Sequence, residues 1–505
     1  MKFNVKKIAK VFSLILIISA LILPMNACAN NKEEEIYLFD SKGEGLLAVK
    51  HEDGEWGFIN KKGKEVIKCK YDDAYPFSNG LAAVCDGGDW IYIDSKGKVK
   101  INGDFQEAYP FDNKGYALVK EDDEYGFIDK KGDWKIKNKY EDLYPFNQFD
   151  LALAKEDGKF GLIDRNGKTV LDFDYDNISE FTDDGYALVS ITNSETDETL
   201  FGLIDRKGEE ILEVEYSNAY YNDNMFNCGL AAFRKTKKTE ENGVTTEEEL
   251  WGFVDPKGNT VVKFKYDDVT TFAENGLAAV CEYDEKNDEY KYGFIDKNGD
   301  MVIDADYDDT HGFSKNGLAA VCKINDKGEE KWGFIDKNGN YVIDNDYSDA
   351  ESFDDNGVAI IQKDNEYGVI NKNGEEIIRI KYADISIWEK WAIAKSSNGN
   401  YILFDLKGNE VDGEKYDEIS FISRGYFSVK EDDEYAVLGS NGKIKVDFTD
   451  DYKFYLITND NYILVENNKD HIEILDMKGE EAIDMDDYVN VLPYYVAATY
   501  LGYAN

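Results

Sequence analysis

Short apolar runs separated by turn residues dominate the pattern of this chain. In one representative stretch the runs occupy residues 277–280, 292–295 and 301–303, and Asn-Gly, Lys-Asn-Gly and Asp-Asp steps bound them. Such steps favour tight turns, and short apolar runs between turns are typical of β-strands. Apolar residues do not recur at the 3.6-residue spacing of a helix. The pattern therefore predicts three or four short antiparallel strands in this stretch.

The same unit returns about every 35 residues. Its fullest copy, Trp-Gly-Phe-Ile-Asp-Lys-Asn-Gly, stands at residues 332–339. A chain with twelve such copies is one supersecondary unit stacked many times. Seven close copies end at Gly63, Gly132, Gly167, Gly208, Gly258, Gly299 and Gly374, and four weaker copies surround Trp90, Tyr401, Tyr435 and Ile472.

Units of 34 to 50 residues with four short strands resemble the blades of a β-propeller. We therefore predict an all-β tandem array of about twelve units. Propellers usually hold about four to eight blades, so we expect two of them, 36–265 and 266–505, the second ending in degenerate copies. An open, twisted β-solenoid is the alternative. Residues 36–39 are expected to supply the first strand, and the apolar segment 488–503 to close a ring or cap its end.

In each good copy an aromatic residue precedes a glycine. The glycine is expected to let a neighbouring backbone approach closely. Because every good copy keeps the aromatic ring, we expect the ring to pack between units, and a carbohydrate-stacking platform is the alternative. These residues are Trp56, Tyr125, Phe160, Phe201, Trp251, Tyr292, Trp332 and Tyr367.

One connection varies in length, and it lies between the second and third strands. The second-strand apolar residue precedes the next aromatic anchor by 9 residues from Tyr116 to Tyr125, but by 21 from Leu230 to Trp251. Insertions gathered on one edge of a repeat array usually form a binding surface. Neutral drift at tolerant hairpin tips is the alternative. The lengthened segments are 190–199, 234–250, 282–291 and 323–331. The candidate contact residues on them are Arg234, Lys235, Lys237, Lys238, Tyr283 and Tyr290.

The net charge of −45 makes nucleic acid an improbable partner, since phosphate contacts need clustered lysine and arginine. At 42% apolar and 14% aromatic, the composition is that of a folded protein. Cys85, Cys281 and Cys322 share one slot after the second strand and are expected to be small buried thiols rather than disulfides.

The N-terminus has the layout of an export signal. Four lysines in the first ten residues precede the apolar stretch 11–23, and Cys28 follows. This resembles a bacterial lipoprotein signal, which implies cleavage after residues 1–27, lipidation of Cys28 and a polar tether over 28–35. Plain secretion is the alternative. We therefore expect a lipid anchor on the outer side of the cell membrane.

The repeated motif resembles the WG-repeat proteins of bacteria, named for the Trp-Gly step at Trp56, Trp251 and Trp332. The likeness extends from residue 36 to about residue 483, although the last three copies lack the aromatic-glycine pair. The resemblance implies an all-β array on a secreted, surface or signalling protein, and no catalytic residues.

Catalytic and metal-binding motifs are weak. Carboxylates could bind calcium at Asp304, Asp306 and Asp308, but their spacing does not match a known calcium loop. No other cofactor is expected. The sequence thus predicts a non-enzymatic, monomeric scaffold that binds a protein or polysaccharide. The alternative is a secreted propeller hydrolase with a carboxylate acid and base.

Overall fold

The computed structural model describes residues 36–39, 45–222, 224–241, 244–284, 288–492 and 494–495. The chain divides into two compact units, Met1–Glu33 and Glu34–Asn505, and every described residue belongs to the second. All regular elements of the described residues are β-strands. They form eleven four-stranded sheets, one three-stranded sheet and one two-stranded pair. The predicted all-β repeat fold is confirmed.

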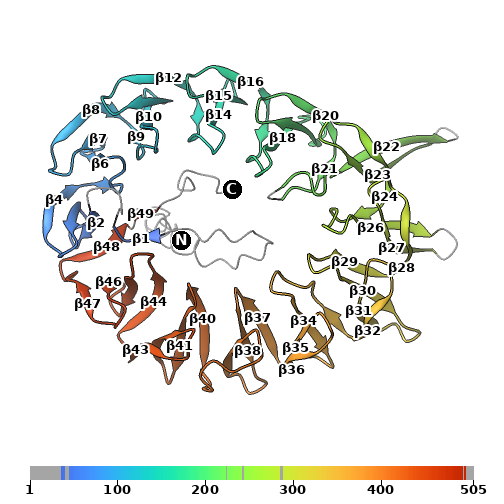
Figure 1. Ribbon diagram of the computed structural model, residues 1–505. Helices are drawn as coiled ribbons and strands as arrows, with labels where there is room; N and C mark the ends of the chain where they lie inside the picture. The colour runs from blue at the N-terminus through green and yellow to red at the C-terminus, as the bar shows by residue number, and fades with distance from the viewer. Residues whose placement is uncertain are drawn as a thin grey trace, which may run out of the picture. The chain divides into compact units, whose positions relative to one another are not determined.

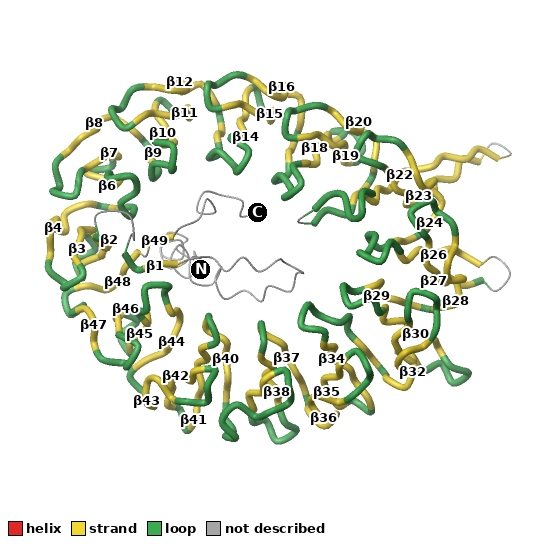
Figure 2. Tube along the Cα trace, viewed as in Figure 1, coloured by secondary structure: helices red, strands yellow, loops and turns green. Residues whose placement is uncertain are grey.

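Twelve of these sheets follow one another around a ring as the blades of a β-propeller (Figure 1). Neighbouring strands of a blade are antiparallel, and we call their positions A to D from the centre of the ring to its circumference (Figure 2). The A–B and C–D connections therefore leave one rim of the ring, and the B–C hairpins leave the opposite rim.

The first six blades contain the following strands, each in the order A to D. Blade 1 has β48 (Tyr488–Leu492), β2 (Leu46–His51), β3 (Trp56–Asn60) and β4 (Glu65–Tyr71); blade 2 has β5 (Asp73–Ala74), β6 (Ala82–Asp86), β7 (Asp89–Ile93) and β8 (Val99–Phe105); blade 3 has β9 (Glu107–Ala108), β10 (Tyr116–Glu121), β11 (Glu124–Asp129) and β12 (Trp134–Tyr140). Blade 4 has β13 (Asp142–Leu143), β14 (Leu151–Glu156), β15 (Lys159–Asp164) and β16 (Thr169–Tyr175); blade 5 has β17 (Asn177–Ile178), β18 (Tyr186–Thr192), β19 (Thr199–Asp205) and β20 (Glu210–Tyr216); blade 6 has β21 (Asn218–Ala219), β22 (Ala231–Glu241), β23 (Val244–Val254) and β24 (Thr260–Tyr266).

The other six blades follow the same order. Blade 7 has β25 (Asp268–Val269), β26 (Ala278–Asp284), β27 (Glu289–Ile295) and β28 (Met301–Tyr307); blade 8 has β29 (Asp309–Phe313), β30 (Ala319–Ile324), β31 (Glu330–Ile335) and β32 (Tyr341–Tyr347); blade 9 has β33 (Asp349–Ala350), β34 (Val358–Lys363), β35 (Glu366–Asn371) and β36 (Glu376–Tyr382). Blade 10 has β37 (Asp384–Trp388), β38 (Trp391–Lys395) and β39 (Tyr401–Asp405); blade 11 has β40 (Glu418–Ser423), β41 (Tyr426–Glu431), β42 (Glu434–Gly439) and β43 (Ile444–Thr449); blade 12 has β44 (Tyr452–Ile457), β45 (Ile463–Asn467), β46 (Ile472–Leu475) and β47 (Glu481–Ile483).

The two ends of the described chain meet in blade 1. There β48 supplies strand A, and Val491 pairs with Val49 of β2. The sequence had suggested residues 36–39 for this place. Instead β1 (Ile36–Tyr37) pairs with β49 (Tyr494–Tyr495) outside the blades. The predicted ring closure by the C-terminal apolar segment is therefore found, for Tyr488–Leu492.

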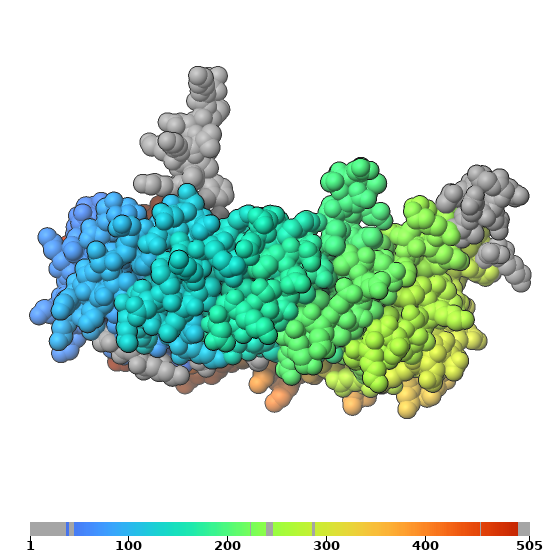
Figure 3. All heavy atoms as spheres, turned by 90° about the horizontal axis from the view of Figure 1, so that it is seen from above, coloured from blue at the N-terminus to red at the C-terminus, as the bar shows by residue number. Residues whose placement is uncertain are grey.

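One ring replaces the two propellers that the sequence suggested. Twelve apolar clusters fill the twelve spaces between neighbouring blades in the described residues, including the space between blades 12 and 1. The cluster between blades 6 and 7 joins Val262 and Tyr266 to Val269 and Phe272, so packing continues across residue 265. Figure 3 shows the blades from blue to yellow packed against one another without a break.

The glycine of strand C meets a bulge in strand D. In blade 8, Trp332 pairs with Tyr347 and Phe334 pairs with Ile343, so three residues of β32 face Gly333 alone. A Cβ on Gly333 would lie 2.7 Å from the Asn345 nitrogen and from the Ile343 oxygen. The same register shift recurs in blades 1, 3, 4, 5, 6, 7 and 9. The motif needs glycine because the backbone of strand D occupies the place of a side chain.

The C–D turn is built by its first carboxylate and its glycine. In blade 8, Asp336 accepts hydrogen bonds from the N–H groups of Asn338 and Asn340 at 2.9 and 3.0 Å. Gly339 has a φ of 82°, which favours glycine.

The turn glycine also touches the preceding blade. A Cβ on Gly339 would lie 3.3 Å from the Ile303 side chain of blade 7. The equivalent contact occurs at every blade boundary. Each glycine and its nearest residue on the preceding blade are Gly63 and Asp484, Gly97 and Ile67, Gly132 and Ile101, Gly167 and Ile136, Gly208 and Val170, Gly258 and Ile211, Gly299 and Val262, Gly339 and Ile303, Gly374 and Ile343, Gly408 and Ile377, Gly442 and Val411, and Gly479 and Val446.

The strand C glycine can be tested by substitution. We expect Gly333→Ala to lower the free energy of unfolding by about 1–3 kcal/mol, because the new methyl group must displace backbone rather than side-chain atoms. Gly439→Ala on β42 is the control, since its Cβ would approach the side-chain atoms Asn441 Oδ1 and Lys445 Cε at 3.1 and 3.2 Å and would lie 3.5 Å from the nearest backbone atom, the Lys443 oxygen. Denaturant unfolding measures both. Equal stability of the Gly333→Ala variant and the wild type would contradict the packing argument.

The turn carboxylates predict how stability depends on pH. Hydrogen bonds from the backbone N–H groups of Lys98, Asp300 and Asn340 lower the pKa values of Asp94, Asp296 and Asp336, respectively. A carboxyl group whose pKa is lowered on folding stabilises the fold above its unfolded pKa, about 3.9 for Asp, and loses that effect as the pH falls through the folded value.

Between pH 7 and pH 5 the net negative charge has the opposite effect on stability, so that stability rises as the pH falls. The self-repulsion of that charge weakens as the pH falls from 7 toward the isoelectric point near 4.4. We therefore expect the unfolding midpoint to rise down to about pH 5 and to fall below about pH 4. Thermal melts across this range measure it, and a midpoint that keeps rising down to pH 3 would refute the role of the turns.

Candidate functional site

The B–C hairpins of blades 5 to 8 reach beyond the length shared by most of the ring. Short blades connect these strands through two residues, as where Glu121 pairs with Glu124. In blade 6, pairing continues out to Glu241 and Val244, so most of the inserted segment is a two-stranded ribbon and not the loop that the sequence suggested. The β22–β23 and β26–β27 hairpins project from adjacent blades (Figure 1).

Carboxylates of the D–A connection hold these hairpins. The Asp308 Oδ2 atom accepts a hydrogen bond from the Ile324 N–H at 2.7 Å, and Asp267 accepts one from the Tyr283 N–H at 3.2 Å. Asp176 does the same for Thr192 at 2.9 Å. The first carboxylate of the D–A connection, which is followed by Asp in blades 7 and 8 and by Asn in blade 5, therefore orients the hairpin.

The basic residues of the blade 6 ribbon are paired with its own carboxylates and those of β20. Arg234 lies 2.8 Å from Glu249, and Lys238 lies 2.7 Å from Glu247 across the ribbon. Lys237 is 3.8 Å from Glu248, and Lys235 is 2.7 Å from Glu215. The three pairs between β22 and β23 stabilise the ribbon, and the pair of Lys235 with Glu215 joins it to β20 of blade 5. A partner of these four cations would have to compete with the carboxylates that already neutralise them.

Tyr283 and Tyr290 face each other across the blade 7 hairpin. Their ring centroids are 5.0 Å apart with planes tilted by 52°, and 43% and 55% of the two residues is exposed. The Tyr283 hydroxyl donates to Asp288. The hairpins of blades 5 and 8 add two exposed apolar side chains, Ile191 and Ile324. Sequence reasoning missed these two, although isoleucine inside an otherwise polar insertion was an available signal.

The repeat aromatics lie between blades. Trp56, Trp251 and Trp332 are buried in the clusters that join their blade to the next. Phe201 is half-buried and belongs to none of the clusters in the described residues. The half-buried rings that pack against a cluster are Tyr125, Phe160, Tyr292 and Tyr367.

The calcium candidates do not converge in the structure. Asp306 pairs with Lys323, and Asp308 lies 2.6 Å from Lys291. Asp304 is exposed on β28. Within the described ranges, no three His, Cys, Asp or Glu side chains form a group that could hold a metal ion.

The cysteines of the described residues are free, and Cys69, Cys85, Cys281 and Cys322 are buried. Burial raises the pKa of the Cys281 thiol to about 12. The predicted signal peptide, the tether and Cys28 lie outside the described residues. The described part of the chain contains no helix that could span a membrane.

Solved structures share limited overall similarity with this chain. A crystal structure of a eukaryotic initiation factor is 11% identical, covers 66% of this chain and 95% of its own, and has a TM-score of 0.31. The computationally designed Ika8 protein is 8% identical, with coverages of 81% and 98% and a TM-score of 0.22. The extracellular domain of the one component system BT4673 from B. thetaiotaomicron is 9% identical, with coverages of 92% and 79% and a TM-score of 0.20. A search among curated proteins finds no match.

The sequence matches the family described as WG containing repeat in nine segments. They are residues 56–90, 92–125, 125–160, 160–193, 201–238, 251–286, 292–327, 332–367 and 367–401. Eight segments begin at the strand C anchor of a blade, and the segment 92–125 begins two residues after the anchor Trp90. Each segment ends in the B–C region or at the anchor of the next blade, so the matched unit is offset from the blade by about half its length. Because these segments together cover more than half of the 505 residues, the chain belongs to the WG containing repeat family.

Proposed function

We propose that this protein is a non-enzymatic binding scaffold that recognises a protein or polysaccharide through the long B–C hairpins of blades 5 to 8. Throughout the ring, apolar packing and glycine contacts tie each blade to its neighbours. The long hairpins extend past these contacts, so their side chains can meet a partner without disturbing the blades.

The observation that carries the proposal is the exposed Tyr283–Tyr290 pair on a lengthened hairpin. Tyrosine is enriched at the energetic centres of interfaces because it combines a large apolar ring with a polar tip. Its neighbours on the same rim are the blade 6 ribbon and the exposed Ile324 of blade 8. Burial chiefly raises the pKa of the nearby Asp267, and the negative charge of Glu248 on the ribbon raises it further.

The proposal includes export and attachment to the outer side of the cell membrane through lipid on Cys28. The basic start, the apolar stretch and the cysteine at position 28 of the sequence support it. A tethered ring would present its hairpins outside the cytoplasm, where surface proteins and glycans are the available partners.

The hairpin surface is tested by the double variant Tyr283→Ser with Tyr290→Ser. A glycan array and a cell-envelope extract first identify a ligand of the wild-type protein. Loss of a central aromatic contact costs about 2 kcal/mol, so the dissociation constant should rise at least about thirtyfold. The control is Val302→Ser with Val342→Ser, two valines on strand D that are 48% and 47% exposed. Unchanged affinity of the tyrosine variant would place the binding site elsewhere.

The lipid anchor is tested by Cys28→Ser in the full-length chain. The wild-type protein should incorporate a labelled fatty acid and sediment with membranes, whereas the variant should lack the label and leave the membrane fraction. Cys85→Ser is the matched control, because that thiol is buried in blade 2. A Cys28→Ser protein that stays labelled would overturn the anchor.

A further inference from the structure

A second surface lies on the rim opposite the long hairpins, where the C–D turns of blades 1 to 3 carry an excess of lysine. From each turn to the end of strand D, these blades contain thirteen lysines and five carboxylates, whereas the same segments of blades 7 to 9 contain five basic and nine acidic residues. The segments are residues 60–71, 94–105 and 129–140 in blades 1 to 3, and 296–307, 336–347 and 371–382 in blades 7 to 9. A chain with a net charge of −45 therefore has one locally basic region here.

The lysines of the three turns are exposed, and we call them the basic sector: Lys61, Lys62, Lys64, Lys96, Lys98, Lys130 and Lys131. The ion pairs in the described part of blades 1 to 3 use other lysines, such as Lys70 with Asp86. The turn carboxylate Asp94 instead accepts hydrogen bonds from the backbone N–H groups of Lys96 and Lys98, both at 3.0 Å. The ammonium groups of the basic sector therefore keep their charge for a partner.

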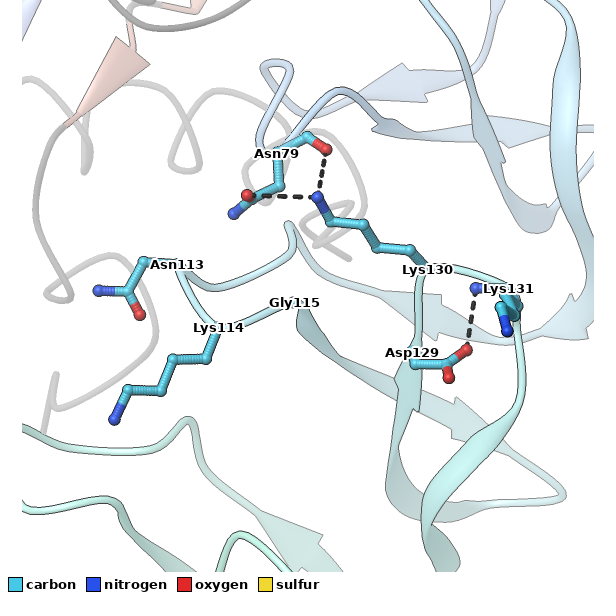
Figure 4. Close-up of a pocket in the computed structure, with 7 residues that line it drawn as sticks. All are labelled: Asn79, Asn113, Lys114, Gly115, Asp129, Lys130 and Lys131. Atoms are coloured by element: carbon cyan, nitrogen blue, oxygen red, sulfur yellow. Dashed lines mark hydrogen bonds between the residues drawn. The ribbon is translucent and has the colours of Figure 1, made fainter.

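Figure 4 shows how the side chains lie around the turn of blade 3. The Lys130 ammonium donates to the Asn79 backbone oxygen at 2.8 Å, which links the turn to the A–B loop of blade 2 and leaves the charge of Lys130 in place. Asp129 accepts a hydrogen bond from the Lys131 N–H at 2.9 Å. The Lys131 side chain extends away from that of Lys114. Charges spread over a rim in this way suit a broad anionic surface and not one small ion.

The N-terminal end of the described chain reaches the ring on this same rim. The N–H groups of Leu38 and Phe39 donate to the Asp460 carboxylate in the A–B loop of blade 12, at 2.9 and 3.2 Å. The Lys61 ammonium lies 5.4 Å from the centroid of the Phe39 ring. The chain therefore enters the ring beside the basic sector, at the boundary of blades 12 and 1.

The length of the predicted tether limits how far this rim can lie from a membrane. The eight residues 28–35 span at most about 28 Å when fully extended. With a lipid on Cys28, the basic sector is thus held close to phospholipid headgroups. Attraction to an anionic surface then adds about fivefold in affinity for each lysine that comes near it, and such a basic patch strengthens attachment by a lipid.

We propose that the basic sector docks on an anionic phospholipid surface, a proposal that rests on the lipid anchor of the proposed function. Phospholipid headgroups are the anionic surface that the tether brings into reach. Blades 1 to 3 lie across the ring from blades 6 to 8 (Figure 1), and the B–C hairpins leave the other rim. Docking of the basic sector therefore turns the long hairpins away from the membrane and toward a partner.

The proposal is tested by sedimentation with vesicles, using the full-length chain with Cys28→Ser so that no attached lipid contributes. Vesicles of phosphatidylcholine alone are compared with vesicles of equal parts phosphatidylcholine and phosphatidylglycerol. We expect tighter binding to the anionic vesicles, weakened at least about tenfold by the added triple change Lys62→Gln, Lys96→Gln and Lys131→Gln. Binding without an attached lipid is reversible and screened by salt, so a washed membrane fraction would still lack this protein.

A matched triple change is the control: Lys207→Gln, Lys257→Gln and Lys407→Gln. These lysines also directly precede the turn glycine and are exposed, and their loss removes the same charge. The affinity should stay nearly unchanged, because blades 5, 6 and 10 lie outside the basic sector. All variants share residues 1–35, so any contribution of that segment cancels in the comparison. Circular dichroism confirms that each variant is folded.

Equal binding to both kinds of vesicle, or equal weakening by the two triple changes, would overturn the proposal, because the contact would then be apolar or diffuse. An oligomer that the basic-sector variant dissociates, without a preference for anionic vesicles, would also overturn it and assign the lysines to the acidic blades of a second copy. Fatty-acid labelling of the wild type tests the anchor separately. An unlabelled wild type with an intact, lysine-dependent vesicle preference would overturn the anchor alone and support the lipid contact.

Discussion

Contact between the glycine of one C–D turn and strand D of the preceding blade sets the spacing of the whole ring. At Gly408 a Cβ would come within 2.2 Å of the Ile377 carbonyl oxygen on strand D of blade 9, and at Gly442 it would come within 2.3 Å of the Val411 carbonyl oxygen, which follows β39 of the three-stranded blade 10. Such contact lets neighbouring sheets come close enough for the apolar clusters between them to fill. The same glycine adopts a positive φ, so one residue type satisfies the turn and the packing together.

Closure depends on repeating that contact without an exception. Gly63 of blade 1 approaches Asp484 of blade 12, just as Gly339 approaches Ile303 within the array. Strand β48 then completes blade 1 from the other end of the chain. The number of blades is therefore a property of the whole array, because a single unit fixes only the small angle to its neighbour.

This explains which features the sequence could reveal. The strands, the turns and the lengthened hairpins follow from local patterns such as Asn-Gly steps and the spacing between aromatic anchors. One ring instead of two could not be predicted, because usual blade numbers describe other propellers and the pairing of Val49 with Val491 joins distant residues. The ribbon of blade 6 could not be predicted for a similar reason. Its Lys and Glu residues are typical of a polar loop, and only the cross-strand register shows that they pair as a ribbon.

The same geometry explains why the differences in length between the units lie in the B–C hairpins. Lengthening a C–D turn would move the glycine that touches the preceding blade and so disturb an interface. Lengthening a B–C hairpin adds paired residues beyond the blade, as from Lys235 out to Glu241, where no interblade cluster depends on them. New side chains can accumulate there at little cost to the fold, so the rim can vary while the ring stays the same.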